Sequence, residues 1–230
     1  MNCLVTGATG KLAQAVIKYL SSKKINIISY SRKQKLDDVD WNSIDVVINC
    51  AARIPRFGVT GSEYFDSNVR FVEKLVPFCK GKRVVHFSTL SFLYRNDVYQ
   101  QTKLIGDSIL MLNKHHFEDL DIHYLPTLDD ELLIETLVGK AKGGLYPIID
   151  RLKYQYISYE DIAQYLYSSL IEEKPQPISS YFTTKDLYEE VISVVGSGIV
   201  TEGEILNRSC IESEYIISNI ELFERFNRNA

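Results

Sequence analysis

The sequence is poor in the residues that build disulfide frameworks and metal centres. Among 230 residues there are only 4 cysteines and 4 histidines. Cys3, Cys50, Cys79 and Cys210 form no CxxC pair and have no histidine at metal-ligand spacing. We therefore expect free thiols in a reducing compartment and no bound metal.

Long apolar runs and an excess of one charge are also missing. No stretch approaches the roughly 18 apolar residues of a membrane span, and the apolar run Cys3-Leu4-Val5 is too short for a secretory signal. The formal net charge is −4, from 26 basic and 30 acidic side chains, which gives no general attraction to nucleic acid or acidic membranes. These absences predict a cytoplasmic protein without nucleic-acid or membrane partners.

What the first half does contain is a regular alternation of short apolar runs with helical patterns. Strands are expected at 2–6, 25–30, 44–50, 83–88 and 121–125, and helices at 11–22, 62–76 and 98–114. Runs that are apolar throughout indicate strands buried on both faces, as in a parallel sheet covered by helices. The predicted fold is α/β, a Rossmann-type doubly wound parallel sheet with right-handed crossovers.

The second half is less regular. Its patterns predict a strand at 154–158, a Gly-rich turn at 196–203, and helices at 129–141, 159–173, 184–195 and 214–227. We expect residues 1–126 to form the dinucleotide-binding core. Residues 127–230 are expected to complete the sheet and to form a small C-terminal α/β cap for the substrate, with an interleaved boundary.

Two glycines stand where the first strand meets the first helix, in the stretch TGATGKLA at 6–13. A tight turn there needs glycine, because the backbone adopts angles that a Cβ disfavours. The turn lets a pyrophosphate approach the N–H groups at the positive end of the helix. A plain strand–helix turn is the alternative. The context favours a dinucleotide site whose ligands are Gly7, Thr9, Gly10, Lys11 and Leu12.

The end of the second strand bears on the choice between NAD and NADP. An acidic residue there holds the ribose 2′-hydroxyl, whereas an arginine accepts a 2′-phosphate. This chain has Ser31-Arg32-Lys33, which suits a phosphate through charge-assisted hydrogen bonds. A solvated basic loop is the alternative. We expect NADP(H) in preference to NAD(H), with Ser31 and Arg32 as ligands.

A tyrosine and a lysine stand four residues apart on a predicted helix. This spacing puts Tyr99 and Lys103 on one face. A nearby ammonium favours tyrosinate and lowers the tyrosine pKa toward the working range, so Tyr99 can pass a proton to or from a substrate oxygen. The fourth strand ends in Ser88-Thr89, and we expect the Thr89 hydroxyl to bind the same oxygen, with Ser88 as the fallback.

Taken together, these stretches resemble the extended short-chain dehydrogenase/reductase family. The motifs that carry the resemblance are VINCAA at 47–52, DSNV at 66–69, VVHFST at 84–89, VY at 98–99, TKLIGD at 102–107 and ISYEDIA at 157–163. The resemblance covers about residues 1–173 and is greatest to the branch that acts on nucleotide-linked sugars, in particular the dTDP-4-dehydrorhamnose reductases.

The resemblance implies roles for further residues. Ala51 and Ala52 line the adenosine side of the cofactor, Asn68 steadies the neighbouring strand, and Pro126 sits close to the nicotinamide. Ser88 and the catalytic Tyr99 and Lys103 also contact the cofactor, Lys103 through the nicotinamide ribose. A homodimer through the helices at 62–76 and 98–114 is a further implication.

The activity implied is that of an NAD(P)-dependent oxidoreductase that reduces a keto group of a nucleotide-linked deoxysugar. Leu90 stands where dehydratases carry an acid, which argues against dehydration. The alternatives are a nucleotide-sugar 4-epimerase with tightly bound NAD, and an NADP-binding regulator or scaffold without catalysis. Arg53 and Arg56 either face a sugar-nucleotide phosphate or belong to a solvated loop.

Overall fold

The computed structural model describes residues 1–55, 58–89, 97–125 and 158–171 with their side chains. It also describes the backbone of the strand segments 127–128, 153–157, 180–183 and 217–218. Within these residues, no helix combines the length and the apolar character needed to cross a membrane.

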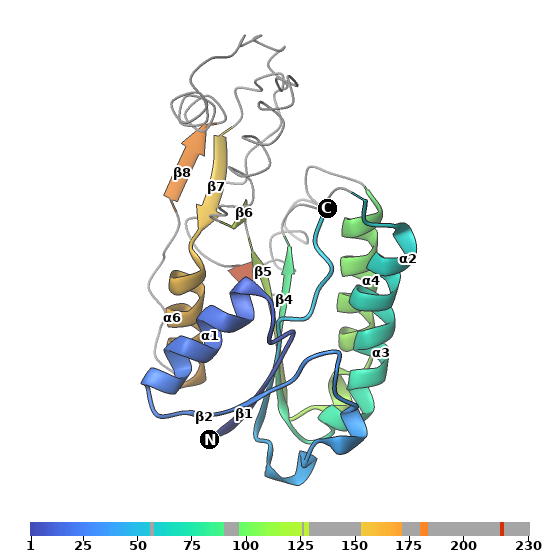
Figure 1. Ribbon diagram of the computed structural model, residues 1–230, viewed down its shortest axis with the longest axis vertical. Helices are drawn as coiled ribbons and strands as arrows, with labels where there is room; N and C mark the ends of the chain where they lie inside the picture. Colours follow the sequence, from blue (N-terminus) through green and yellow to red (C-terminus); the bar gives the residue numbers. More distant parts are fainter. Residues whose placement is uncertain are drawn as a thin grey trace.

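Six strands form the main sheet, in the order β2-β1-β3-β4-β5-β9 (Figure 1). Their bounds are β1 Asn2–Thr6, β2 Asn26–Ser29, β3 Val46–Asn49, β4 Arg83–Thr89, β5 Asp119–Leu125 and β9 Ile217–Ser218. Strands β1 to β5 pair in parallel, and β9 pairs with β5 in the antiparallel sense. The Rossmann-type parallel sheet and the strands predicted for the first half are confirmed.

The strand order reverses between β1 and β3. The chain leaves β1 through helix α1 to β2 at one edge, then returns past β1 to β3 through two short 3₁₀ helices, η1 Leu36–Asp38 and η2 Trp41–Ser43. In open parallel sheets, ligands bind beyond the carboxyl ends of the strands at such a reversal. The topology therefore points to the space between the ends of β1 and β3.

Helices cover both faces of the sheet. Helices α1 (Lys11–Ser22) and α6 (Tyr159–Leu170) lie side by side on one face, and α4 (Val98–Leu112) lies on the other (Figure 1). The strands alternate between two buried cores: Val5 packs under α1 and α6, whereas Leu4 faces the α4 side. Both layers are thus built from the same short apolar strands.

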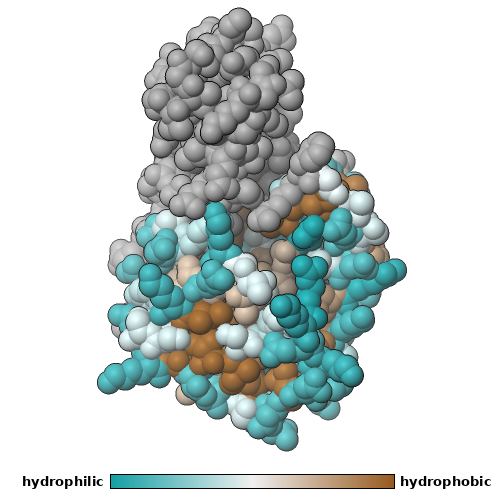
Figure 2. Space-filling model, in the orientation of Figure 1, coloured by the Kyte–Doolittle hydropathy of each residue, from teal (hydrophilic) through white to brown (hydrophobic). Residues whose placement is uncertain are grey.

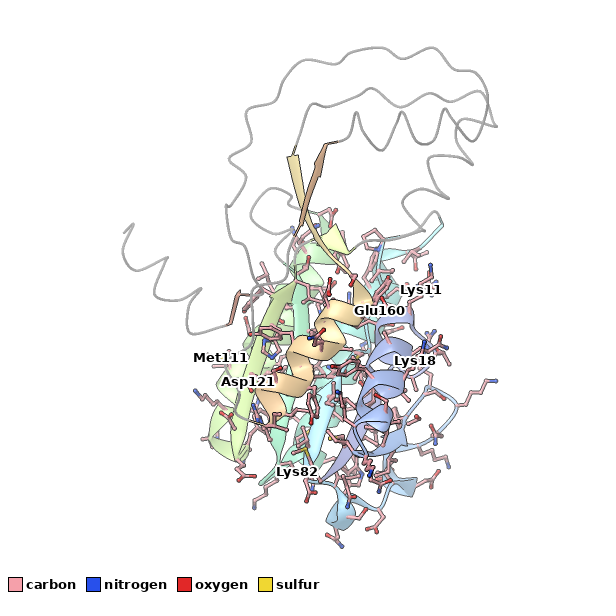
Figure 3. The ribbon with its side chains drawn as sticks, turned by 90° about the vertical axis from the view of Figure 1, so that its left-hand side faces the viewer. Lys11, Lys18, Lys82, Met111, Asp121 and Glu160 are labelled. Carbon is pink, nitrogen blue, oxygen red and sulfur yellow. The ribbon has the colours of Figure 1, made fainter. Side chains whose placement is uncertain are left out.

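The carboxyl ends of the parallel strands define one edge of the main sheet. Figure 3 places Lys11, at the start of α1, and Glu160, in the first turn of α6, near that edge. Lys82, which precedes β4, lies at the opposite edge, where its ammonium donates to the carbonyl oxygens of Trp41 and Ile44.

The helix expected at 62–76 is a longer helical segment whose hydrogen-bond pattern changes along its length. It consists of α2 Gly61–Phe65, the π-helix η3 Asp66–Arg70, α3 Phe71–Leu75 and the 3₁₀ helix η4 Val76–Cys79. Apolar periodicity does not reveal such a change, because the same face stays buried. A π turn widens the helix locally and is common at functional sites. Helix α4 begins as expected but ends at Leu112, two residues before the predicted end at 114, and the 3₁₀ helix η6 Lys114–His116 follows it.

The second half of the chain supplies elements to the main sheet and its helices, and it also forms a second, smaller sheet. Strands β6 Thr127–Leu128, β7 Lys153–Ile157 and β8 Ser180–Thr183 form a second sheet in the order β6-β7-β8, and α6 packs on α1. The helix predicted at 214–227 is wrong at 217–218, which pair with β5 as strand β9. The helices predicted at 129–141 and 184–195 and the turn at 196–203 lie outside the described residues.

Candidate active site

The turn after β1 places Gly7 directly against the segment that follows β3. Gly7 has a φ of +66°, and a Cβ on it would lie 2.8 Å from the backbone N and Cα of Ala51. Gly10 closes the turn by donating its N–H to the Gly7 carbonyl oxygen at 2.8 Å and is the N-cap of α1. Since glycine has no side chain to cap the helix, this end of α1 can receive an anion.

An open cleft of about 280 Å³ lies at the carboxyl ends of β1 and β3. It is bounded by the turn after β1, the end of β2, the segment after β3 and part of the helical stretch that contains α3. The predicted cofactor ligands that line it are Gly7, Thr9, Gly10, Ser31, Arg32, Ala51 and Ala52. Lys11 and Leu12 follow in the first turn of α1 and do not line it.

Sequence reasoning missed several residues of this cleft. The rings of Tyr30 and Phe71 stack with their centroids 6.0 Å apart and an interplanar angle of 22°, and both line the cleft with Lys74. Lys74 adds a third cation to the cleft, which Arg32 and Arg53 also line. The sequence signal that could have found Phe71 and Lys74 is their spacing. They stand three residues apart on a predicted helix that packs on the sheet, so they share one face of it.

The Asn68 side chain is hydrogen-bonded both to the segment after β3 and to helix α4. Its Oδ1 accepts the N–H of Arg53 at 2.8 Å, and its Nδ2 donates to the Arg53 carbonyl oxygen at 3.2 Å and to Thr102 Oγ1 at 3.1 Å. Arg53 lines the cleft and pairs with Glu63 at 2.8 Å, so it is not simply solvated. Arg56 lies outside the described residues.

Helix α4 begins with a capping box that orders the turn carrying Tyr99. The Asp97 carboxylate accepts the N–H of Gln100 at 3.2 Å, and Gln100 Oε1 accepts the N–H of Asp97 at 3.1 Å. Tyr99 is half-buried, with its ring centroid 5.9 Å from that of Tyr64. Thr89, also half-buried, ends β4.

The Lys103 side chain is buried beneath this edge of the sheet, with 3% of its surface exposed. Its ammonium donates to the Phe87 carbonyl oxygen at 2.7 Å and lies 3.2 Å from His86 Nε2. Burial lowers the pKa of Lys103, and the Asp107 carboxylate opposes that effect. Burial, and secondly the Lys103 charge, lower the pKa of His86 to about 4. His86 is therefore neutral at neutral pH.

The predicted catalytic residues share one helix and one strand end. Tyr99 and Lys103 come from α4, and Ser88 and Thr89 from the carboxyl end of β4. The Ser88 hydroxyl donates to Asp107 Oδ2 at 2.6 Å. None of these residues lines the cleft, and Pro126 lies outside the described residues.

Within the described part of the chain, no three His, Cys, Asp or Glu side chains gather to hold a metal.

Comparisons with known proteins fit this geometry. Residues 3–110 match the model of the NAD dependent epimerase/dehydratase family. No curated protein sequence matches the chain. Among solved structures, UDP-glucuronic acid 4-epimerase from Bacillus cereus in complex with NAD is similar, with a TM-score of 0.69 and 16% identity over 89% of this chain and 88% of that chain.

Two further solved structures are similar over comparable lengths. A dTDP-4-dehydrorhamnose reductase ortholog from Clostridium acetobutylicum has a TM-score of 0.63 and 18% identity over 94% of this chain and 89% of that chain. UDP-N-acetylglucosamine 4-epimerase from Bacillus cereus has a TM-score of 0.63 and 19% identity over 91% and 90%.

At these identities the solved structures establish the fold, and the family model covers the chain from β1 into α4. The predicted resemblance is confirmed by both. The match to the NAD dependent epimerase/dehydratase family lies within residues 3–110, and the similar solved structures extend the likeness in fold over about nine tenths of the chain.

Proposed function

We propose that the enzyme is a reductase that uses NADPH to reduce a keto group of a nucleotide-linked deoxysugar. The observation that carries the proposal is the cleft at the strand reversal, where Gly7 meets the backbone of Ala51 too closely for any side chain. Such a turn admits a diphosphate against the backbone and the start of α1. The similar dTDP-4-dehydrorhamnose reductase ortholog supports the substrate class.

The chemistry assigned to the chain is acid–base work beside the cofactor. When bound, the dinucleotide supplies the hydride. Tyr99 protonates the carbonyl oxygen, and Thr89 orients that oxygen by a hydrogen bond. The Lys103 ammonium stabilises negative charge on the phenol and holds the ribose with an N–H that the Phe87 carbonyl oxygen leaves free. The small sheet β6-β7-β8 forms part of the substrate side.

A 4-epimerase is the second candidate, because two of the similar structures are nucleotide-sugar 4-epimerases, one of them in complex with NAD. Incubation with a panel of nucleotide-linked keto sugars separates the candidates. A reductase consumes one NADPH for each sugar reduced. An epimerase purifies with bound NAD and interconverts sugars without net oxidation. Retained NADPH binding with no turnover of any sugar would instead support a regulator or scaffold.

The NADP preference is proposed from Arg32 and Lys74, two of the three cationic side chains that line the cleft; the third, Arg53, pairs with Glu63. Arg32→Ala should weaken NADPH binding by roughly 10- to 100-fold, the usual worth of a charge-assisted hydrogen bond, and leave NADH binding nearly unchanged. Fluorescence titration measures both. Lys33→Ala, an exposed neighbour outside the cleft, is the control. Equal losses for both cofactors in Arg32→Ala would contradict the preference.

A cytoplasmic location belongs to the same proposal. Cys3, Cys50 and Cys79 are free thiols. Burial raises the pKa of each of them, so they stay protonated and unreactive. Unpaired thiols are typical of reducing compartments.

We also propose a homodimer through α4. The outer face of this helix exposes apolar side chains along its length, and Figure 2 shows hydrophobic surface near α2 and α4. The exposed residues are Val98, Leu104, Ile105, Met111 and Leu112, with Phe65 on α2. Exposed apolar patches of this kind mark association surfaces.

Ile105→Glu is expected to convert the dimer to a monomer, because it buries a charge in the interface. Light scattering coupled to size-exclusion chromatography measures the mass. Ile171→Glu is the matched control, since Ile171 is 38% exposed against 42% for Ile105 but follows α6 on the other face of the sheet. A monomeric wild-type protein would reject the dimer.

A further inference from the structure

A row of buried polar side chains runs beneath the cleft, from β1 across the sheet to α4. Adjacent strands pair Thr6 with Asn49 and Asn49 with His86, and Lys103 and Asp107 reach down one turn apart from α4. Each of these residues is at most 4% exposed. Polar groups this deep are costly unless they satisfy one another, so their hydrogen bonds decide how they are protonated.

The orientation of the Asn49 amide is fixed by a backbone donor. The Ala51 N–H can only donate, and it lies 3.2 Å from Asn49 Oδ1 and 3.4 Å from Thr6 Oγ1. Asn49 Oδ1 also accepts from Thr6 Oγ1 at 2.6 Å. Asn49 Nδ2 therefore faces His86 Nδ1, 2.8 Å away. An amide N–H donates, so Nδ1 must accept, and the proton of the neutral imidazole is on Nε2.

The protonated Nε2 lies between a carboxylate and an ammonium. It is 3.2 Å from Asp107 Oδ1 and 3.2 Å from Lys103 Nζ, and of these two only the carboxylate oxygen can accept its proton. The contact between His86 Nε2 and Asp107 Oδ1 is electrostatic and not a well-aligned hydrogen bond, because Asp107 Oδ1 has no hydrogen-bond partner among the described groups. Asp107 Oδ2 is occupied by the Ser88 hydroxyl.

The titratable groups around Lys103 and Asp107 come from four parts of the fold. Asp107 on the same helix raises the Lys103 pKa against the effect of burial, and Cys50 after β3 acts in the same direction more weakly. From β4, His86 contacts the ammonium and stays neutral. On β5, Tyr124 has its pKa raised by burial and by Asp107, so it is neutral as well. Asp107 is therefore the principal counter-charge of the buried lysine.

We propose that Asn49, His86 and Asp107 are positioning residues for Lys103. Asn49 holds His86 in the Nε2–H tautomer, His86 joins the sheet to Asp107, and Asp107 supplies the negative charge that keeps the ammonium in the core. The consequence for catalysis rests on the proposed function, because it assumes that Lys103 assists Tyr99. The tautomer and the protonation of Lys103 do not depend on it.

The same amide also reaches the cofactor side. Asn49 Oδ1 accepts the N–H of Ala51, whose backbone forms the wall against Gly7. Thr6, the other donor to this oxygen, immediately precedes Gly7. One side chain thus fixes both the wall of the cleft and, through His86, the surroundings of the lysine.

Nuclear magnetic resonance of the wild-type protein tests the tautomer directly. In protein labelled with ¹⁵N-histidine, His86 should show an unprotonated Nδ1 and a protonated Nε2 at pH 7, and this pattern should persist to pH 5. The opposite tautomer, or a doubly protonated ring at pH 7, would overturn the inference. This measurement requires no variant and no substrate.

The counter-charge is tested by titrating Lys103 in labelled protein. Asp107→Asn should lower the Lys103 pKa further, by about one unit or more, and Asp107→Glu should restore it toward the wild-type value. Ser88→Ala, which removes a hydrogen bond to Asp107 but no charge, should leave it nearly unchanged. A Lys103 pKa that is the same in folded Asp107→Asn and wild type would contradict the role of Asp107.

These outcomes are separable from those of the proposed reaction. A protein with the Nε2–H tautomer and the Asp107 dependence but no turnover of keto sugars would keep this inference and lose the proposed function. An active reductase with the opposite tautomer would do the reverse.

Discussion

Tyr99→Phe is expected to lose turnover by at least about 100-fold while it keeps its affinity for the dinucleotide. The substitution removes one hydroxyl and leaves the ring, which packs beside Tyr64, and the capping box that starts α4. General acid–base catalysis by a positioned side chain contributes roughly 10²- to 10⁴-fold. Initial rates with saturating cofactor, together with a separate titration of cofactor binding, measure the two effects.

The neighbouring tyrosine provides a matched control. Tyr64→Phe removes the same atom from a ring whose centroid is 5.9 Å from that of Tyr99, and no role is assigned to its hydroxyl. It should retain nearly full activity. If Tyr99→Phe were fully active, or if the two variants lost activity equally, the catalytic assignment would fall.

Gly7→Ala should abolish dinucleotide binding, with an affinity loss of about 100-fold or more. The new Cβ would lie 2.8 Å from the backbone of Ala51. Because the atoms that it meets belong to the backbone, they cannot move aside as the end of a flexible side chain would. The turn must then shift away from the segment after β3, and a displacement of this kind is costly for a positioned ligand. Calorimetric titration with NADPH measures the loss.

Gly81 separates the close contact from the cost of the backbone angle. Its φ of +67° matches the +66° of Gly7, but a Cβ on it would meet nothing within 4 Å. Both alanine variants bear the penalty of a left-handed residue, roughly 1–2 kcal/mol. Only Gly7→Ala should also lose the cofactor. Equal cofactor affinities in the two variants would show that the turn after β1 does not contact the dinucleotide.

The sheet and its main helices could be predicted because burial leaves a pattern in the chain. A strand such as 44–50 is apolar on both faces only if helices cover both faces, and the helix at 98–114 shows a clear apolar period. The approach of Gly7 to Ala51 could not be predicted, since it joins residues 44 positions apart. The tight turn after the first strand already accounts for a glycine at position 7, so the sequence carries no separate signal of this close approach.

The polar row beneath the cleft shows where single-sequence reasoning stops. His86 is recognisable as a buried strand residue, but its tautomer depends on how Asn49 is held by Ala51. Asp107 stands four residues after Lys103, which predicts a shared helix face but not burial of both. Strand β9 was misread as helix because two residues of edge pairing leave no periodic pattern.

The most direct test of the central claim is a crystal structure of the complex with NADPH and a nucleotide sugar. The account predicts the diphosphate over Gly7 and Gly10, the 2′-phosphate beside Arg32, and the Tyr99 hydroxyl within hydrogen-bond reach of the sugar oxygen at the reacting carbon. A dinucleotide bound outside the cleft, or a Tyr99 hydroxyl directed away from the nicotinamide, would contradict it.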